Sequence, residues 1–299
     1  MHVASKLDTP TSPPGAAARP WRARAQALLG TLVEVSAPAR SDAELRRWSE
    51  PAFERIASVQ ASMSFHCAAS DLASIARARA GSELTVHIDT WRTLALAFEL
   101  EEASQGCFNC AIAPILVQRR LLPRPAGAHT PCATSARAAL TLLEGERVRV
   151  EAPLWIDLGG VAKGVAVDAA VHAMRLAGAP AGMVNASGDL RVFGGEGREI
   201  VLRDPAQPQR LIGMARVTDG AVATSAGYFR SGNALIDPSA ARAGNAGQPA
   251  SVTVFAPSCA IADGLTKVLA LRTNEAATLL RRYGAEGLFI DGDGRVHHV

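Results

Sequence analysis

The sequence predicts an α+β fold. Strand-like runs and amphipathic helical segments follow one another without the regular strand–helix alternation of a Rossmann sheet, and no repeat of fixed period occurs. The chain has 299 residues, of which 48% are hydrophobic, enough for one large domain or two interleaved smaller ones with a substantial core. We therefore expect strands and helices in mixed order within a single folded unit.

The first half of the chain combines a leader, one strand and two helices. Residues 1–22 contain repeated prolines and no apolar signal-peptide core, so we expect a disordered leader before a domain at 23–299. Alternating residues predict a strand over 26–36. Ser41 caps a helix with apolar residues at helical spacing, and a second helix is expected from Thr90 to Ser104. Residues 121–136 are rich in Pro and Ala and predict a loop.

The second half is mostly β. Short strands are expected at 147–150 and 154–158, and Gly159 and Gly160 then open a helix that reaches Leu176, with Gly178 as its C′ residue. Two closing helices, 260–271 and 274–283, precede a hairpin of 288–290 with 296–299. The remaining predicted strands are 182–184, 190–193, 199–203, 211–218, 221–224, 234–236 and 251–255.

Charge and composition exclude several classes of protein. With 31 basic and 28 acidic residues, a net charge of +3 and 5% aromatic residues, the chain lacks the footprint of a nucleic-acid binder. No apolar run approaches the roughly 18 residues of a membrane span, so we expect no stable membrane insertion. Five cysteines, an odd number, do not suggest a disulfide framework. We expect a cytoplasmic protein, with a periplasmic location as the alternative.

The segment Asp157–Gly164 is the densest cluster of chemically active residue types. A strand ends in an acid, two glycines permit close backbone approach, and Lys163 stands in the first turn of a helix whose N–H groups favour anions. The segment matches neither a Walker A loop nor a G-x-G-x-x-G fingerprint. A phosphate or nucleotide site and a plain strand-to-helix turn both stay open.

Three further segments contain polar residues at expected element ends. Residues 184–190 and 223–228 place small and polar residues where either a ligand or a tight turn would need them. In residues 259–267, Asp263 is a candidate ligand for a hard cation such as Mg²⁺. Asp263 and Lys267 are also spaced i, i+4, which suits a surface ion pair. None of these segments decides between the two interpretations alone.

Other motifs argue against alternative chemistries. Cys107 and Cys110 form a lone C-x-x-C without a second pair, which is weak evidence for zinc or redox chemistry, and residues 291–294 predict a hairpin turn rather than a calcium loop. Hydrolase motifs such as G-x-S-x-G and H-E-x-x-H are absent. The chain has only three lysines, and two of them, Lys163 and Lys267, fall in the segments just described.

Taken together and in this order, the motifs resemble those of the ApbE family, the FAD:protein FMN transferases. The likeness covers nearly the whole folded chain, and eight weak motifs in the family's order are jointly specific. They are residues 29–31, 63–65 with 70–72, 106–109 with Pro114, 156–164 with 167–168, 184–190, 223–228, 236–238 and 251–263.

The resemblance implies two interlocked α/β subdomains with largely antiparallel sheets and a flavin cleft between them, in a T-fold-like arrangement. It also implies that FMN is moved from FAD, with Mg²⁺, onto a Thr or Ser hydroxyl of an acceptor flavoprotein, which releases AMP. Asp263 and Lys267 are the expected catalytic residues, and the expected metal site comprises the Gly160 carbonyl, Asp263 and Thr266. The residues expected to contact FAD are Leu29, Phe65, Cys107, Phe108, Asn109, Asp157, Lys163, Asn185, Ser225 and Leu235.

The chain departs from the family pattern at several positions. Asn109 stands where an Asp is usual, Ala234 where a His is usual, residues 239–241 replace Arg-Thr-Gly, and Lys267 replaces a metal-binding Thr. We hypothesise that Lys267 supplies positive charge to the FAD pyrophosphate in place of part of the metal's role, with Thr266 as a substitute oxygen ligand. Two alternatives stay open: an FAD-binding protein without transferase activity, and an FAD pyrophosphatase that produces FMN and AMP.

Overall fold

The centre of the fold is an eight-stranded sheet in which every neighbouring pair of strands is antiparallel. The structure is a computed structural model and describes residues 20–207, 209–226, 236, 249–273 and 275–299. The predicted α+β class and largely antiparallel sheets are confirmed. In spatial order the strands are β1 (Trp21–Leu28), β2 (Thr31–Pro38), β6 (Gly182–Ala186), β7 (Asp189–Phe193), β10 (Gly220–Ala226), β11 (Ser251–Ala256), β12 (Glu286–Ile290) and β13 (Val296–His298).

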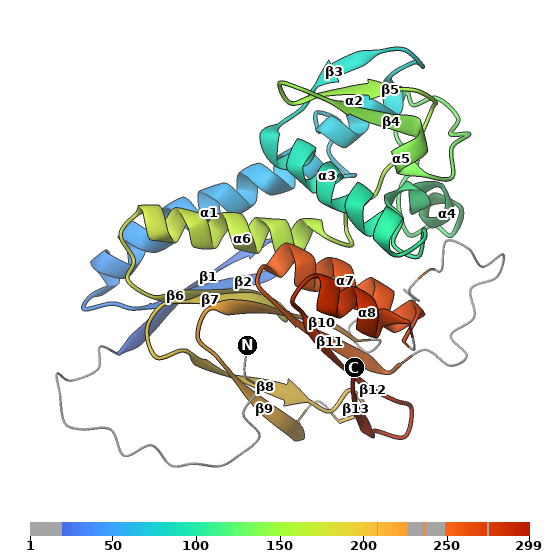
Figure 1. The fold of residues 1–299 in the computed structure, drawn as a ribbon. Coiled ribbons are helices and arrows are strands. Elements are labelled where there is room, and N and C mark those ends of the chain that lie inside the picture. Colours follow the sequence, from blue (N-terminus) through green and yellow to red (C-terminus); the bar gives the residue numbers. More distant parts are fainter. Residues whose placement is uncertain (1–19, 208, 227–235, 237–248, 274) are drawn as a thin grey trace.

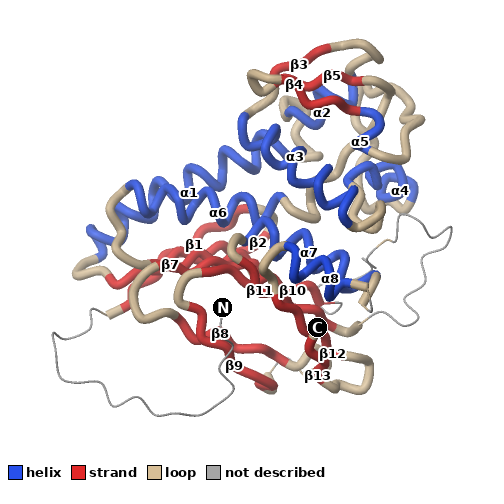
Figure 2. The backbone as a smooth tube through the Cα atoms, in the orientation of Figure 1, coloured by secondary structure: helices blue, strands red, loops and turns tan. Residues whose placement is uncertain are grey.

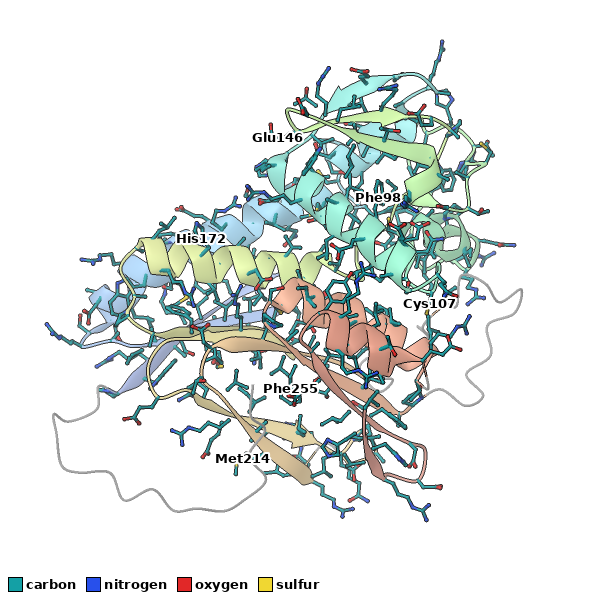
Figure 3. All side chains as sticks on the ribbon, viewed as in Figure 1. Phe98, Cys107, Glu146, His172, Met214 and Phe255 are labelled. Carbon is teal, nitrogen blue, oxygen red and sulfur yellow. The ribbon has the colours of Figure 1, made fainter. Side chains whose placement is uncertain are left out.

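The two faces of this sheet are covered differently (Figure 1). Helices cover one face, and a hairpin covers the other. Side chains alternate along each strand, so Ala221 and Val254 pack in the helical core whereas Val222 and Phe255 face the hairpin; Figure 3 shows Phe255 between sheet and hairpin. The helices are α1 (Asp42–Met63), α6 (Ala162–Leu176), α7 (Cys259–Leu271) and α8 (Ala276–Arg282), and the hairpin strands are β8 (Arg198–Arg203) and β9 (Leu211–Val217).

A second lobe is inserted between α1 and α6 (Figure 2). The chain leaves the main layer after α1, builds a three-stranded sheet with one 16-residue helix and several shorter ones, and returns at α6, so the two parts are interlocked in sequence. Among the described residues, no helix is both long and apolar enough to cross a bilayer. The lobe comprises α2 (Asp71–Arg77), β3 (Glu83–Thr85), α3 (Ile88–Ala103), the 3₁₀ turn η1 (Cys110–Ile112), α4 (Ala113–Gln118), α5 (Ala136–Ala139), β4 (Leu140–Leu143) and β5 (Arg147–Val150).

The two helices that the sequence predicted most clearly, α1 and α6, begin and end where local chemistry places them. Ser41 caps α1 by accepting a hydrogen bond from Glu44 N at 3.2 Å. A buried apolar stripe then runs from Leu45 to Met63 and packs on α6. At the end of α6, Gly178 has φ +87°, the left-handed conformation of a C′ glycine.

Several predicted elements need correction. The predicted strand 26–36 is two strands joined at Leu29 and Gly30, whose φ angles are 57° and 71°. Strand β1 begins at Trp21, inside the predicted leader. Residues 154–158 form no strand: their apolar side chains are buried, but the backbone joins no sheet. Of the predicted strand 234–236, only Ile236 lies within the described residues.

Candidate active site

Helices α6 and α7 meet closely at their N-terminal ends. A Cβ atom at position 164 would lie 2.3 Å from the Cys259 carbonyl oxygen, so only glycine allows this approach. One turn later, the Asp168 carboxylate accepts hydrogen bonds from the backbone N–H groups of Cys259 and Ala260, each at 2.9 Å. Arg191 on β7 pairs with the same carboxylate at 2.6 Å. These contacts fix α6 against α7 and against the sheet.

The first of two lysine–aspartate pairs joins α6 to the sheet. Lys163 Nζ donates to Asp189 Oδ2, at the first residue of β7. Burial, together with the nearby charge of Asp263, raises the pKa of Asp189 to about 6, although Lys163 and Lys267 act in the opposite direction. Burial lowers the pKa of Lys163, but the carboxylates of Asp263 and Asp189 outweigh it, and the net pKa is raised. The Lys163 ammonium therefore stays charged.

The second pair lies within one turn of α7. Lys267 Nζ donates to Asp263 Oδ1 at 2.5 Å, to the Asp263 carbonyl oxygen at 3.1 Å and to Thr266 Oγ1 at 2.9 Å. The other carboxylate oxygen, Asp263 Oδ2, accepts from Gly164 N at 3.2 Å. Asp263 and Thr266 are both fully buried. The i, i+4 pair considered from the sequence thus forms, but in the interior rather than on the surface.

Asp157 and Gly160 lie beside this second pair. Asp157 N donates to the Cys110 carbonyl at 2.9 Å, and Asp157 Oδ1 accepts from Gly159 N at 3.2 Å. Burial raises the pKa of Asp157, while the hydrogen bond from Gly159 N and the neighbouring His66 and Lys267 lower it in part. A Cβ atom at Gly160 would lie 3.3 Å from Phe108 Cε2 and 3.7 Å from Lys267 Cγ, so this glycine lies against both side chains.

The segment Cys107–Asn109 closes the same region from the second lobe. Cys107 (Figure 3) and Phe108 are each only 5% exposed, so they offer little surface to a ligand in this conformation. Asn109 Oδ1 accepts from Ala111 N at 2.8 Å, and its Nδ2 donates to the Thr134 carbonyl at 2.7 Å. An aspartate could not make the second bond. Burial raises the pKa of the Cys110 thiol, which disfavours the reactive thiolate.

Three predicted FAD contacts, Leu29, Asn185 and Ser225, lie at one end of the main sheet. Leu29 occupies the β1–β2 turn, which contacts the β6–β7 turn through Thr31 and Ser187. Asn185 Oδ1 accepts from Gly188 N at 2.9 Å and holds that second turn. Gly188 in turn lies against Thr224, the neighbour of Ser225 on β10.

The two remaining predicted FAD contacts are Phe65 and Leu235, and the structure describes only the first of them. Phe65 is half-buried and packs with Ala76, Ala113 and Trp155. Leu235 lies outside the described residues.

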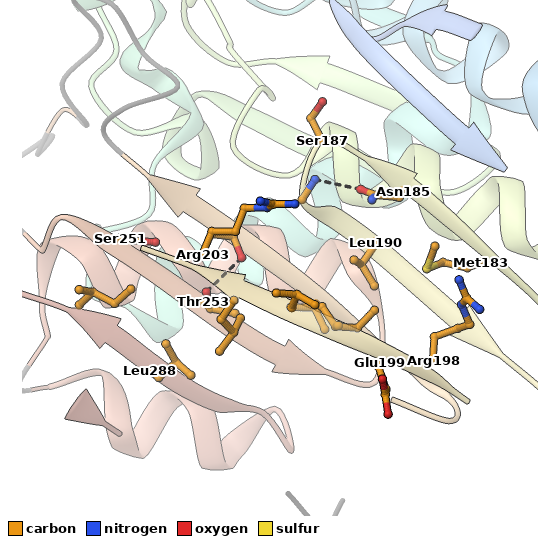
Figure 4. Close-up of a pocket in the computed structure, with 17 residues that line it drawn as sticks. Met183, Asn185, Ser187, Leu190, Arg198, Glu199, Arg203, Ser251, Thr253 and Leu288 are labelled. Atoms are coloured by element: carbon orange, nitrogen blue, oxygen red, sulfur yellow. Dashed lines mark hydrogen bonds between the residues drawn. The ribbon is translucent and has the colours of Figure 1, made fainter. Parts of the chain in front are cut away.

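A pocket of about 330 Å³ lies on the opposite face of the sheet, between the sheet and the β8–β9 hairpin (Figure 4). Among the predicted site residues that the structure describes, Asn185 alone lines it. Apolar side chains such as Met183 and Leu288 line much of it, and a bond between Thr224 and Thr253 of 3.0 Å crosses its floor. The lysine–aspartate pairs therefore form a site separate from this pocket.

Comparison with known proteins identifies the family. The sequence profile of the ApbE family matches residues 29–289. The chain belongs to the ApbE family. A Vibrio cholerae serotype O1 protein named FAD:protein FMN transferase is 27% identical over 226 residues, or 69% of this chain and 67% of that protein. A Treponema pallidum protein of the same name is 28% identical over 315 aligned residues, covering 91% of this chain and 85% of the other.

The fold of this ApbE-family chain matches that of solved relatives. The crystal structure of an ApbE protein from Thermotoga maritima superposes with a TM-score of 0.80 over 93% of this chain and 97% of the other, at 22% identity. At that identity the likeness concerns the fold alone.

The oxygens predicted to bind magnesium do not fit Mg²⁺ in this arrangement. Mg²⁺ requires near-octahedral oxygen ligands at roughly 2.0–2.1 Å. Asp263 Oδ1 and Thr266 Oγ1 instead bind the Lys267 ammonium, and Thr266 Oγ1 also donates to the Asp263 carbonyl at 2.7 Å. An ammonium cannot ligate a cation and would repel one. Among the described residues, no group of three or more His, Cys, Asp or Glu side chains is arranged to hold a metal ion.

Two residues central to this ApbE-family site were not predicted from the sequence, although both stand in its motifs. Asp189 binds Lys163, and Asp168 joins α6 to α7. For Asp189, the available signal was a carboxylate at the first residue of a strand that contains three apolar residues and one arginine. For Asp168, it was an acid among the apolar and small residues of α6, a pattern that also fits a surface position.

Proposed function

We propose that this chain is an FAD:protein FMN transferase, which moves FMN from FAD to a Thr or Ser hydroxyl of an acceptor flavoprotein and releases AMP. Membership of the ApbE family and the shared name of its two curated relatives support this proposal. Within the molecule, one observation carries it: the two lysines among the described residues converge where α6 begins. Cationic side chains beside a helix N-terminus suit a pyrophosphate.

The reaction exchanges a phosphoanhydride bond for a phosphoester bond. The acceptor hydroxyl oxygen attacks the phosphorus on the FMN side of the FAD pyrophosphate, and a new P–O bond forms. The bond from that phosphorus to the bridging oxygen breaks, AMP leaves with the bridging oxygen, and the hydroxyl proton passes to water. Catalysis of such a transfer depends mainly on positioning and on neutralising phosphate charge.

Residues of the chain would divide this task. Lys163, with about a third of its side chain exposed, is the residue that can extend toward a phosphate while Asp189 orients it from the protein side. Asp263 holds Lys267 and the backbone of Gly164 together, which sets the distance between the two positive charges. Leu29, Asn185 and Ser225, at the end of the sheet, are proposed to line FAD.

One assay separates this proposal from its two alternatives. Purified protein is incubated with FAD and Mg²⁺, with and without a flavodoxin-like acceptor carrying an exposed Thr, and the products are resolved by mass spectrometry. Covalent FMN on the acceptor supports the transferase. Free FMN and AMP without labelling would indicate a pyrophosphatase, and unchanged FAD would indicate a binding protein.

The same assay tests the acceptor chemistry. Replacing the acceptor Thr with Ser should preserve labelling, and replacing it with Val should abolish it. The cytoplasmic location stays a prediction.

A further inference from the structure

The Lys267 ammonium is enclosed by oxygen atoms in the way a bound cation would be. An ammonium has three N–H donors. Lys267 Nζ has three acceptors within 2.5–3.1 Å, namely both the carboxylate and the carbonyl of Asp263 and the hydroxyl of Thr266. Its side chain is 12% exposed, and that of Asp263 is fully buried. Every donor is therefore satisfied inside the protein.

The charge balance of the site is a second indication that the Lys267 ammonium occupies the place of a cation. The carboxylates of Asp157, Asp189 and Asp263 lie close enough to interact electrostatically with one another or with the two lysines. With Lys163 and Lys267 present, two of these three negative charges are neutralised by lysine. Without Lys267, a single lysine would face all three, and the excess of two negative charges is what a divalent cation would neutralise.

The Lys267 side chain is also largely enclosed along its length, with only 12% of it exposed. Its stem passes Gly160, where a Cβ atom would lie at an ordinary van der Waals distance of 3.7 Å from Lys267 Cγ. The ammonium at its end is fixed by hydrogen bonds. A divalent cation could reach Asp263 Oδ1 only by displacing a like charge from 2.5 Å away.

We propose that Lys267 is a covalently attached substitute for a divalent metal ion, so that this enzyme transfers FMN without Mg²⁺. The inference rests on the proposed transferase function for its activity but not for its cation binding. It predicts that shortening Lys267 exposes a divalent-cation site made of Asp263 and Thr266.

Cation binding is tested without any reaction. Binding of Mn²⁺ alone is measured by electron paramagnetic resonance on the full chain, for wild type, Lys267→Thr and Lys267→Met. We expect both variants to bind Mn²⁺ at least about tenfold more tightly than wild type, since a repulsive charge has been removed. Equal affinity in wild type and variants, whether tight or weak, would overturn the proposal.

A matched control removes a different positive charge. Arg175→Ala acts at the opposite end of α6, where Arg175 pairs with exposed Asp219, and should bind Mn²⁺ as wild type does. Circular dichroism checks that each variant is folded. If neither Lys267 variant folds, wild type alone decides, because micromolar Mn²⁺ binding by wild type contradicts the proposal and its absence supports it.

The activity arm uses FAD, the acceptor and either EDTA or Mg²⁺. Wild type should transfer FMN at rates within about twofold in the two buffers, whereas Lys267→Thr should lose at least about tenfold in EDTA and recover in Mg²⁺. Complete dependence of wild type on Mg²⁺ would overturn the proposal. If wild type transfers no FMN under either condition, the transferase proposal fails, and the Mn²⁺ titration still decides the role of Lys267.

Discussion

The two lysine–aspartate pairs of the site have the same chemistry and different surroundings. Lys163 pairs across elements, from α6 to β7, and 34% of its side chain is exposed. Lys267 pairs within one turn of α7 and is 12% exposed. Asp189 binds a lysine that still faces outward, whereas Asp263 binds one that is enclosed. The difference indicates that Lys163 is suited to meeting a ligand and Lys267 to fixing charge within the protein.

The largest effect is expected when the enclosed pair is broken. Asp263→Asn keeps the shape of the side chain but removes the charge opposite Lys267 and replaces one acceptor oxygen with an NH2 donor, so Lys267 and Gly164 N can no longer both donate to this side chain. We expect FMN transfer to fall by about 10²-fold or more, the range seen when one preorganised electrostatic group is lost. The rate is measured by acceptor labelling. Near wild-type labelling by a folded variant would show that Asp263 is dispensable.

Breaking the exposed pair should have a smaller effect on the reaction. Lys163→Met removes one charge-assisted hydrogen bond to phosphate, worth roughly 1.5–3 kcal/mol, so kcat/KM for FAD should fall about 10–100-fold. Steady-state kinetics with varied FAD measure this. Arg175→Ala, at the far end of the same helix, is the control. If KM and kcat of Lys163→Met equal those of wild type, Lys163 does not contact FAD.

The two lysine–aspartate pairs lie together because α6 approaches α7 closely. Gly164→Ala would force a methyl group against the Cys259 carbonyl, a rigid backbone atom, and should destabilise the fold by about 1–3 kcal/mol. Gly264→Ala is the matched control, because its nearest obstacle is the tip of the Leu100 side chain, which can move. Urea unfolding compares the two, and equal losses would refute the argument.

The smallest effect concerns pH. The pKa of Asp189 is raised from 3.8 to about 6 in the folded protein, so the folded state binds a proton more tightly than the unfolded state between these values. Stability contributed by this group is present below pH 3.8 and is lost as the pH rises through about 6. The melting temperature of wild type should therefore fall by a few degrees relative to Asp189→Asn over this range. If the melting temperatures of wild type and Asp189→Asn change in parallel with pH, the raised pKa of Asp189 is contradicted.

The sequence was informative where a pattern repeats locally. Helix α1 shows apolar residues at helical spacing over 22 residues and a capping serine, so its position was predictable. The β1–β2 turn was missed because Leu29 adopts a positive φ that Asn or Gly usually occupies in such turns. Residues 154–158 were misassigned because buried apolar residues in an irregular segment have the same composition as a short buried strand.

The site was predictable as a set of segments but not as a set of contacts. Motifs containing Lys163 and Asp263 identified the right helices. Their partners could not be identified, because Asp189 lies 26 residues from Lys163, and the contact between Gly164 and Asp263 spans 99 residues. The i, i+4 spacing of Asp263 and Lys267 indicated an ion pair. Whether that pair is exposed or buried depends on how α6 packs on α7, which the spacing does not encode.

The contacts of Asp168 bear on whether the chain folds before its substrate binds. Its carboxylate occupies the N–H groups of Cys259 and Ala260 and is itself paired with Arg191, so the start of α7 has its own anion. Together with the lysine pairs, this completes the helix junction from the polypeptide alone. Synthesis of the folded chain then need not wait for its vitamin-derived substrate, and we expect riboflavin-starved cells to accumulate folded, idle protein rather than aggregates.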